Sequence, residues 1–305
     1  MDLPSANGRT GAIRCGGDGR TVTTMPRTRL FAQVDVFSTG PWSGNPVAVV
    51  LDGTDLTDEE MQRLARWANL SETTFVLPPT VPEADYRLRI FTPQGELPFA
   101  GHPTLGSARA WLDGGGNPRH DDHIVQECAA GPVVVRAADD ATLSFAAPPR
   151  VRAGALDDEY LGRIEAALGI THDRVVAHQW VDNGPGWAVV QLRTAEEVLA
   201  LEPDFSRLPA AMVGAIGAHP QGHHHQFEMR TFAPGAGVPE DPACGSMNAG
   251  VGQWLTSTGA VPSSYRVAQG TRLGRAASIG VTADTDGTVW VSGAATVRIR
   301  GTIAL

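Results

Sequence analysis

Apolar and polar residues alternate near the start of the chain with two different periods. Residues 29–37 alternate as in a strand, and a turn rich in glycine and proline separates them from a second apolar run at 47–53. From Asp58 to Ala68, apolar side chains recur every three or four residues behind Thr57, which opens a capping-box pattern. The pattern predicts two paired strands followed by an amphipathic helix.

One arrangement of residues occurs twice, once in each half of the chain. Arg89–Leu112 and Arg230–Leu255 both begin with R-x-F-x-P, continue through a turn rich in glycine and proline, and end in a helix-compatible run that closes with Trp-Leu. Two copies with a long period are typical of duplicated domains, whereas a solenoid needs several short repeats. The sequence therefore predicts two half-chains of similar plan.

The duplication sets the expected domain boundaries in this chain of 305 residues. We expect domains at residues 29–147 and 148–305, joined by a linker at 146–155, with the last strands of the second domain as candidates for a return to the first. Residues 1–28 are rich in glycine, threonine and arginine and lack the apolar segment of a secretory signal. They are expected to form a disordered tail.

Charge and cysteine content exclude several classes of protein. The formal net charge of −9 argues against a nucleic acid as partner, because phosphate binding needs a basic surface. No apolar run reaches about 18 residues, so no membrane span is expected. Cys15, Cys128 and Cys244 lie far apart without a C-x-x-C pair, which supports neither a disulfide framework nor a structural zinc site. We expect the protein in the reducing cytoplasm.

Three adjacent histidines at 223–225 raise the question of a metal site. Three neighbouring residues of a regular strand cannot all turn toward one ion, and no carboxylate lies nearby at ligand spacing, so we interpret this segment as a solvated loop. The sequence also has no G-x-G-x-x-G or P-loop pattern, which argues against a nucleotide cofactor.

The turn in each repeat carries residues that suit chemistry at the start of a helix. Pro103 fits a first helical turn because its missing N–H has no partner there, and Gly101 lets the backbone approach a ligand. Free N–H groups at such a helix start favour an anion. By themselves, however, Glu72 reads as a solvated carboxylate at a helix end, and His102 and Asp241 read as turn or cap residues.

Four motifs, in this order, make the chain resemble a known family. They are N-L-S-E-T at 69–73, F-T-P…P-F-A-G-H-P-T-L-G at 91–106, R-x-F-x-P…E-D-P-A-x-G-S at 230–246, and Q-G…G-R at 269–275. From about Leu30 to Leu305, the chain resembles the PhzF family of phenazine-biosynthesis-like isomerases.

This resemblance implies the diaminopimelate-epimerase-like fold. In that α+β fold, two pseudo-symmetric domains each wrap a mixed sheet around a central helix, and the active site lies in the cleft between them. The best-characterised members shift a proton and a double bond in a cyclic diene acid. The resemblance further implies a homodimer with a small-molecule carboxylate substrate and with neither a metal nor an organic cofactor.

The resemblance also assigns roles to particular residues. Glu72 is the expected general acid and base, since a carboxyl whose pKa is raised by partial burial can both remove and return a proton. His102 or Asp241 would orient the substrate or hold Glu72 in its reactive protonation state. The residues expected to bind the substrate, chiefly its carboxylate, are Ser71, Gly101, Cys244, Gly245 and Ser246.

Cys244 departs from the isomerase pattern, in which threonine is usual at this position. Epimerase and racemase relatives place catalytic cysteines at the positions of Cys244 and Ala100, and alanine cannot act as an acid or base. Racemisation by two thiols is therefore excluded. Two interpretations of Cys244 stay open: a single thiol base whose pKa is lowered by a helix N-terminus, or a small buried substitute for threonine.

These observations predict a cofactor-independent isomerase that shifts a proton and a double bond in a small unsaturated carboxylic or amino acid. The phenazine precursor and alkyl-proline precursors are both compatible with the motifs, and both belong to secondary metabolism. The alternatives are a one-base epimerase that uses Cys244 and a ligand-binding protein of the same fold without catalytic activity.

Overall fold

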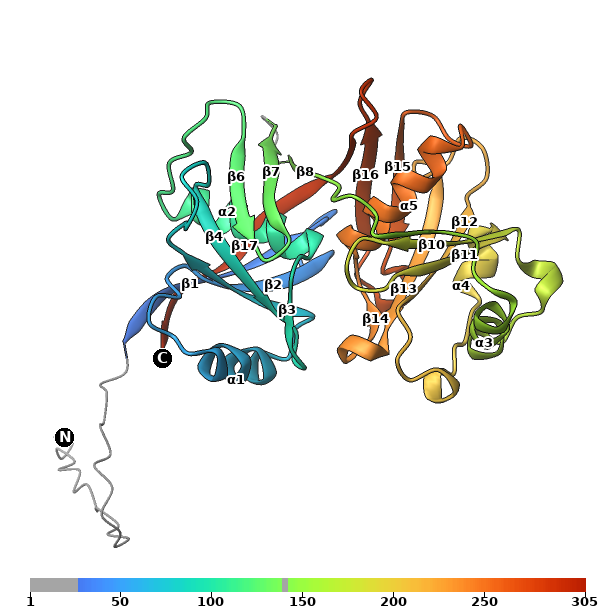
Figure 1. The fold of residues 1–305 in the computed structure, drawn as a ribbon, viewed down its shortest axis with the longest axis horizontal. Helices are drawn as coiled ribbons and strands as arrows, with labels where there is room; N and C mark the ends of the chain where they lie inside the picture. The colour runs from blue at the N-terminus through green and yellow to red at the C-terminus, as the bar shows by residue number, and fades with distance from the viewer. Residues whose placement is uncertain (1–26, 139–141) are drawn as a thin grey trace, which may run out of the picture.

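The computed structural model describes residues 27–138 and 142–305. Figure 1 shows two lobes side by side, each with strands around a helix. Residues 1–26 of the predicted tail lie outside the described part, whereas Thr28 already belongs to the first strand. The seventeen described strands are joined by hydrogen bonds into one continuous sheet.

In the described part of the chain, eight strands and two helices form the first lobe before the chain crosses to the second. They are β1 (Thr28–Val36), β2 (Asn45–Val50), α1 (Asp58–Ala68), β3 (Glu72–Leu77), β4 (Tyr86–Phe91), β5 (Glu96–Leu97), α2 (Gly101–Asp113), β6 (Ile124–Cys128), β7 (Gly131–Ala137) and β8 (Thr142–Ala146).

The second lobe follows and ends in a strand that both lobes share. Its elements are β9 (Arg152–Gly154), α3 (Asp158–Leu168), η1 (His172–Arg174), β10 (Ala177–Asp182), β11 (Ala188–Thr194), α4 (Ala195–Leu199), η2 (Phe205–Arg207), β12 (Val213–Ala218), β13 (Phe227–Ala233), η3 (Pro234–Ala236), β14 (Val238–Asp241), α5 (Gly245–Ser257), β15 (Ser264–Gln269), η4 (Thr271–Leu273), β16 (Ala277–Ala283) and the shared strand β17 (Val289–Ala304).

The two lobes repeat the same order of strand pairing. In the first lobe, β1–β2, β3–β4 and β6–β7 are antiparallel, and β2–β3 and β4–β6 are parallel. In the second, β10–β11, β12–β13 and β15–β16 are antiparallel, and β11–β12 and β13–β15 are parallel. The R-x-F-x-P repeats lie on β4 and β13, and each is followed by a helix, α2 or α5.

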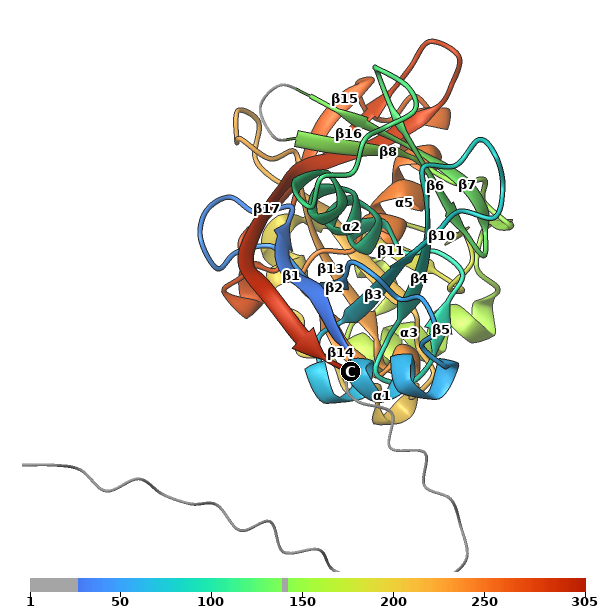
Figure 2. The same cartoon turned by 90° about the vertical axis from the view of Figure 1, so that its left-hand side faces the viewer.

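Strand β17 closes the first lobe into a ring. Its first half pairs with β8 and also with β16 of the second lobe, and its second half pairs with β1. Figure 2 shows α2 inside this ring, with the strands of the first lobe around it. Because β17 pairs with strands of both lobes, the end of the chain holds them together.

Helices α2 and α5 are buried over most of their surface, which explains their composition. A Cβ added to Gly106 would lie only 2.3 Å from Val47, and one added to Gly250 would lie 2.2 Å from the Val181 carbonyl oxygen. Small residues are needed at these positions because a helix inside a ring of strands meets close neighbours on every side. The solvent-facing α1 instead shows the predicted amphipathic pattern and the predicted capping box of Thr57 and Glu60.

Two segments differ from what the sequence predicts. Strand β12 received no prediction because its sequence, VGAIGA, is rich in glycine and alanine, which are poor strand formers. It is nevertheless buried between β11 and β13, where a Cβ added to Gly217 would lie 2.2 Å from the Thr194 carbonyl oxygen. The segment 146–155, predicted as a linker, contains β9, which pairs with β10.

Candidate active site

The N-termini of α2 and α5 meet between the lobes. A Cβ added to Gly101 would lie 2.9 Å from the Cα of Gly245, and one added to Gly245 would lie equally close to Gly101. Only glycine allows two helix starts to touch through their backbones in this way. The N-cap residues, Ala100 and Cys244, make no side-chain capping bond, so the partial positive charge of both helix starts is directed into the same cleft.

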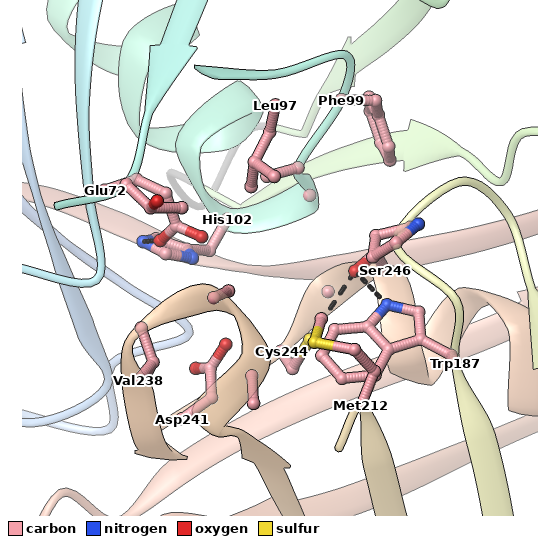
Figure 3. A pocket seen from close by; sticks show the side chains of 17 residues that line it. Glu72, Leu97, Phe99, His102, Trp187, Met212, Val238, Asp241, Cys244 and Ser246 are labelled. Atoms are coloured by element: carbon pink, nitrogen blue, oxygen red, sulfur yellow. Dashed lines mark hydrogen bonds and ion pairs between the residues drawn. The ribbon is translucent and has the colours of Figure 1, made fainter. Parts of the chain in front are cut away.

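Glu72 and His102 meet on the first-lobe side of this cleft. Glu72 is the first residue of β3, and His102 lies in the first turn of α2. Both residues are buried, with exposed fractions of 7% for Glu72 and 2% for His102. Glu72 Oε2 lies 3.4 Å from His102 Nε2, and neither atom has a hydrogen-bond partner among the described residues. Figure 3 shows the carboxyl beside the imidazole ring.

Burial favours the neutral form of both groups of this pair. It raises the pKa of the Glu72 carboxyl well above its usual value, and the nearby Asp241 carboxylate raises it further. Burial lowers the pKa of His102 to about 3, although a hydrogen bond with the Pro46 backbone acts in the opposite direction. Proline has no N–H, so the imidazole is the donor in that bond. The Nε2 atom, which has no hydrogen-bond partner among the described residues, then carries the free lone pair that faces Glu72.

Asp241 lies on the second-lobe side, at the end of β14. Its Oδ1 accepts hydrogen bonds from Asn45 Nδ2 at 2.7 Å and from the Ala243 amide at 3.0 Å. Burial raises the pKa of Asp241 to about 6, against the effect of its hydrogen bonds with Ala243, Cys244 and Asn45. The cleft therefore holds two carboxyl groups whose pKa values lie above those of ordinary surface carboxyls.

Cys244 and Ser246 lie at the start of α5. The Cys244 sulfur is 3.5 Å from the Ser246 hydroxyl, which also accepts a hydrogen bond from the Trp187 indole at 2.9 Å (Figure 3). Burial, together with the Asp241 charge, raises the pKa of the Cys244 thiol well above its usual value. This direction favours the neutral thiol, and with it the interpretation of Cys244 as a small buried substitute for threonine over that of a thiol base whose pKa is lowered by the helix N-terminus.

The remaining walls of the cleft are mostly apolar, and among residues 27–138 and 142–305 no arginine lines it. These walls are formed by Thr92, Leu97, Phe99, Ala100, Pro185, Trp187, Met212, Ala233, Ala236 and Val238. The cavity volume is about 30 Å³, which holds ordered water but not a six-membered ring.

The structure brings together all but one of the residues singled out from sequence. Glu72, Gly101, His102, Asp241, Cys244, Gly245 and Ser246 line the cleft, whereas Ser71 does not. Sequence reasoning missed Asn45, which belongs to a G-N-P turn whose polar residue could have drawn attention. Trp187, a residue type typical of a core or a cleft wall, does line the cleft.

The histidines at 223–225 lie outside the cleft and contact different partners. His225 lies 3.0 Å from the Ser278 hydroxyl, and His223 stacks on His219. Among residues 27–138 and 142–305, no group of His, Cys, Asp and Glu is arranged to hold a metal ion. No helix in the same ranges is long and apolar enough to cross a membrane.

Comparison with known proteins places the chain in a family. The family model described as "Phenazine biosynthesis-like protein" matches residues 34–301. "Antisense-enhancing sequence 1" of Schizosaccharomyces pombe is 41% identical over 89% of this chain and 97% of its own length. A trans-2,3-dihydro-3-hydroxyanthranilate isomerase of Pseudomonas aeruginosa is 34% identical over 80% of this chain and 87% of its own length.

Solved structures agree with these sequence matches. A PhzF-family protein of Enterococcus faecalis superposes with a TM-score of 0.73 at 25% identity, over 92% of this chain and all of its own. The ring of strands around α2 is therefore part of a known fold, and the motifs identified in the sequence lie where its two lobes meet. The chain belongs to the PhzF family of phenazine-biosynthesis-like isomerases.

Proposed function

We propose that this isomerase shifts a proton, and with it a double bond, within a small unsaturated carboxylic acid. The observation that carries the proposal is the contact of Glu72 with His102, with Asp241 on the opposite side of the same buried cleft. A buried carboxyl with a raised pKa exchanges protons near neutral pH more readily than an ordinary surface carboxylate does. The names of several relatives, which are isomerases of a cyclic dihydro acid, support this substrate class.

The proposed reaction needs one group that takes a proton and then returns it. The Glu72 carboxylate removes hydrogen from an allylic carbon, the double bond moves by one position, and the resulting Glu72 acid protonates the far end of the system. The Nε2 lone pair of His102 accepts a hydrogen bond from Glu72 whenever that carboxyl is protonated. Atoms and charge balance within the substrate, so no oxidant or reductant is required.

The two helix starts suit the carboxylate of the substrate. The backbones of Gly101 and Gly245 meet in the cleft, and the uncapped N–H groups around them favour an anion where no lysine or arginine does. The apolar walls would enclose the rest of the molecule. The repeated strand pairing supports the finer description as a diaminopimelate-epimerase-like fold of two pseudo-symmetric domains, while a homodimer, a cytoplasmic location and a role in secondary metabolism remain predictions.

Two alternatives are less well supported. A one-base epimerase would need the Cys244 thiolate, but burial favours the neutral thiol. The second alternative, binding of a nucleic acid, is raised by the name of the Schizosaccharomyces relative, which refers to antisense enhancement. A net charge of −9 does not favour binding of a polyanion, and the buried acid groups of the cleft suit a small substrate better.

The proposal is tested by following two readouts on the same acids. The protein is incubated with trans-2,3-dihydro-3-hydroxyanthranilate and with other conjugated cyclic acids, and ultraviolet absorbance reports migration of the double bond. Chiral chromatography of saturated amino and hydroxy acids reports inversion. We expect a change in absorbance without inversion. Inversion of saturated acids without double-bond migration would overturn the proposal in favour of an epimerase.

A further inference from the structure

Asn45 joins the two lobes at the centre of the cleft. It is the first residue of β2 in the first lobe, and its side chain is completely buried. Its Nδ2 atom lies 2.7 Å from Asp241 Oδ1 and 3.3 Å from the Ala243 carbonyl oxygen, both in the second lobe. The same nitrogen lies 3.3 Å from His102 Nδ1. One side-chain nitrogen therefore touches both the acid of the second lobe and the histidine of the first.

The chemistry of these neighbours fixes the orientation of the amide. An amide nitrogen carries two hydrogens, which match the two oxygen acceptors at Asp241 and Ala243. The opposite orientation would place the amide oxygen against two other oxygens, one of them charged. His102 Nδ1 needs no hydrogen from Asn45, since the ring donates to the Pro46 backbone.

In this orientation the amide oxygen of Asn45 lacks a hydrogen bond from the described residues, which lowers the stability of the folded protein. The Oδ1 atom of Asn45 is buried and has no hydrogen-bond partner among the described residues. A buried acceptor without a partner is unfavourable and calls for an explanation. The two hydrogen bonds that Nδ2 donates to Asp241 and Ala243 give that explanation, because they hold the loop that carries Asp241.

The backbone next to Asn45 is fixed to the second lobe as well. The Gly44 amide donates to the Arg275 carbonyl oxygen at 2.5 Å, and Arg275 Nε donates to the Gly44 carbonyl oxygen at 3.1 Å. Gly44 has a φ of +75°, and a Cβ there would lie 2.1 Å from the Val36 carbonyl oxygen, so this tight turn requires glycine. The turn therefore presents Asn45 to the second lobe in one fixed direction.

We propose that Asn45 is a positioning residue of the reaction: its amide latches the Asp241 loop of the second lobe onto the first lobe, beside His102. This inference rests on the proposed function. Asn45 does not line the cavity, so it acts through Asp241 and not on the substrate. A carboxyl placed by this latch keeps a constant distance from Glu72 across the cleft, as a proton shift between fixed positions needs.

The test compares two variants with a matched control. Asn45→Asp keeps the shape of the side chain but replaces the donor by a carboxyl, and Asn45→Ala removes the side chain beyond Cβ. Gln126→Glu introduces a carboxyl at another buried amide of the first lobe, which donates to Thr104 away from the cleft. This control measures how far a buried carboxyl elsewhere in the first lobe changes the Asp241 titration and kcat when the hydrogen bond between Asn45 and Asp241 is intact.

The first readout needs no substrate. Carbon-13 carboxyl NMR follows the titration of Asp241 in the ligand-free protein, with Asp241→Asn used for assignment. The titratable groups around Asp241 are Glu72 on β3, His102 on α2, Glu240 on β14 and Cys244 at the start of α5. The pKa of Asp241 is about 6 in the native protein. It should rise in Asn45→Ala and rise further in Asn45→Asp, where a second carboxyl faces Asp241, but not in Gln126→Glu.

The second readout is the kinetics of the isomerase. We expect kcat to fall by roughly 100-fold in Asn45→Asp while KM changes by less than about threefold, because misplacement of Asp241, which lies across the cleft from Glu72, slows the chemical step and leaves the carboxylate site intact. An Asp241 titration that stays unchanged in both Asn45 variants would overturn the inference, as would a fall in kcat no larger than that of Gln126→Glu. A shifted titration in a protein that converts no unsaturated acid would support the latch and refute the proposed function.

Discussion

Glu72 and Glu228 are both buried glutamates that contact a histidine, yet their surroundings differ. Glu72 Oε2 lies 3.4 Å from His102 and has no hydrogen bond, whereas Glu228 Oε2 lies 3.2 Å from His219 and its Oε1 accepts a hydrogen bond from Thr271 at 2.6 Å. Glu72 lines the cleft between the helix starts, and Glu228 does not. A carboxyl beside an imidazole is therefore not sufficient to mark an active site.

The pKa values sharpen this difference. Burial raises the pKa of Glu228 to about 7, against the hydrogen bond from Thr271. Burial and a second carboxylate, that of Asp241, both raise the pKa of Glu72. Glu72 and Asp241 thus lie on opposite sides of the cleft, and each is a carboxyl with a raised pKa. Glu228 instead contacts Thr271 and His219, and no second acid is among the groups that shift its pKa. Under the proposed function, we expect the reactivity of Glu72 to depend on the absence of a hydrogen-bond partner for Oε2 among the described residues.

The largest expected effect separates the two glutamates directly. Glu72→Gln should lower kcat by about 10³-fold or more, because the amide cannot carry the proton. Glu228→Gln should leave kcat within about threefold, since the loss is confined to a contact away from the cleft. Steady-state kinetics on a common substrate measures both. Similar losses in the two variants would remove the distinction on which the assignment of the site rests.

Asp241→Asn should give the next largest effect. The Asp241 charge helps to raise the pKa of Glu72, so its removal lets Glu72 ionise at lower pH. Proton removal requires the Glu72 carboxylate, and the rising limb of kcat/KM should therefore move to lower pH, together with a fall in kcat of roughly 10- to 100-fold. The pH dependence of kcat/KM checks this shift, and a limb that moves to higher pH would contradict it.

Glu228 should affect stability more than catalysis. Its pKa is about 7 in the folded protein and 4.5 in the unfolded chain, so between these values the folded state binds more protons. The free energy of unfolding should therefore decrease as pH rises from about 4.5 to about 7. Glu228→Gln should remove this part of the decrease, as measured by urea unfolding across the range. A slope identical to that of the native protein would show that Glu228 ionises normally.

The smallest effect is expected for Cys244→Thr. Threonine is close to cysteine in size and places a hydroxyl near Ser246, which already accepts a hydrogen bond from Trp187. We expect kcat to change by less than about threefold, because the neutral thiol takes no part in proton transfer. Loss of activity in this variant, with Glu72→Gln still active, would favour the one-base epimerase.

The sequence predicted what depends on neighbouring residues. The capping box of α1 involves Thr57 and Glu60, only three residues apart, and its pattern is visible without tertiary contacts. The duplicated motif likewise pointed to helix starts at Gly101 and Gly245. Strand β12 could not be predicted in this way, because its glycines suit contacts that exist only in the folded protein: a Cβ at Gly217 would lie 2.2 Å from the Thr194 carbonyl oxygen.

The cleft was predicted only through resemblance to a family. Glu72 and His102 are brought together by the pairing of β3 and the burial of α2, which no local pattern encodes. Asn45 lies 196 residues from Asp241, so its bond to that carboxyl appears only when the lobes are assembled. The raised pKa of Cys244 also follows from burial, which a motif at a helix start does not reveal.

The central claim is that Glu72 itself carries the proton between two carbons of the substrate. The most direct test is to convert an accepted unsaturated acid in deuterated buffer and to locate deuterium in the product by NMR, using the native protein, Glu228→Gln and Glu72→Gln. Because the Glu72 acid exchanges its proton with solvent before it protonates the second carbon, we predict deuterium at the newly saturated carbon with the first two proteins and none above the enzyme-free background with Glu72→Gln. Equal incorporation by Glu72→Gln would contradict the claim.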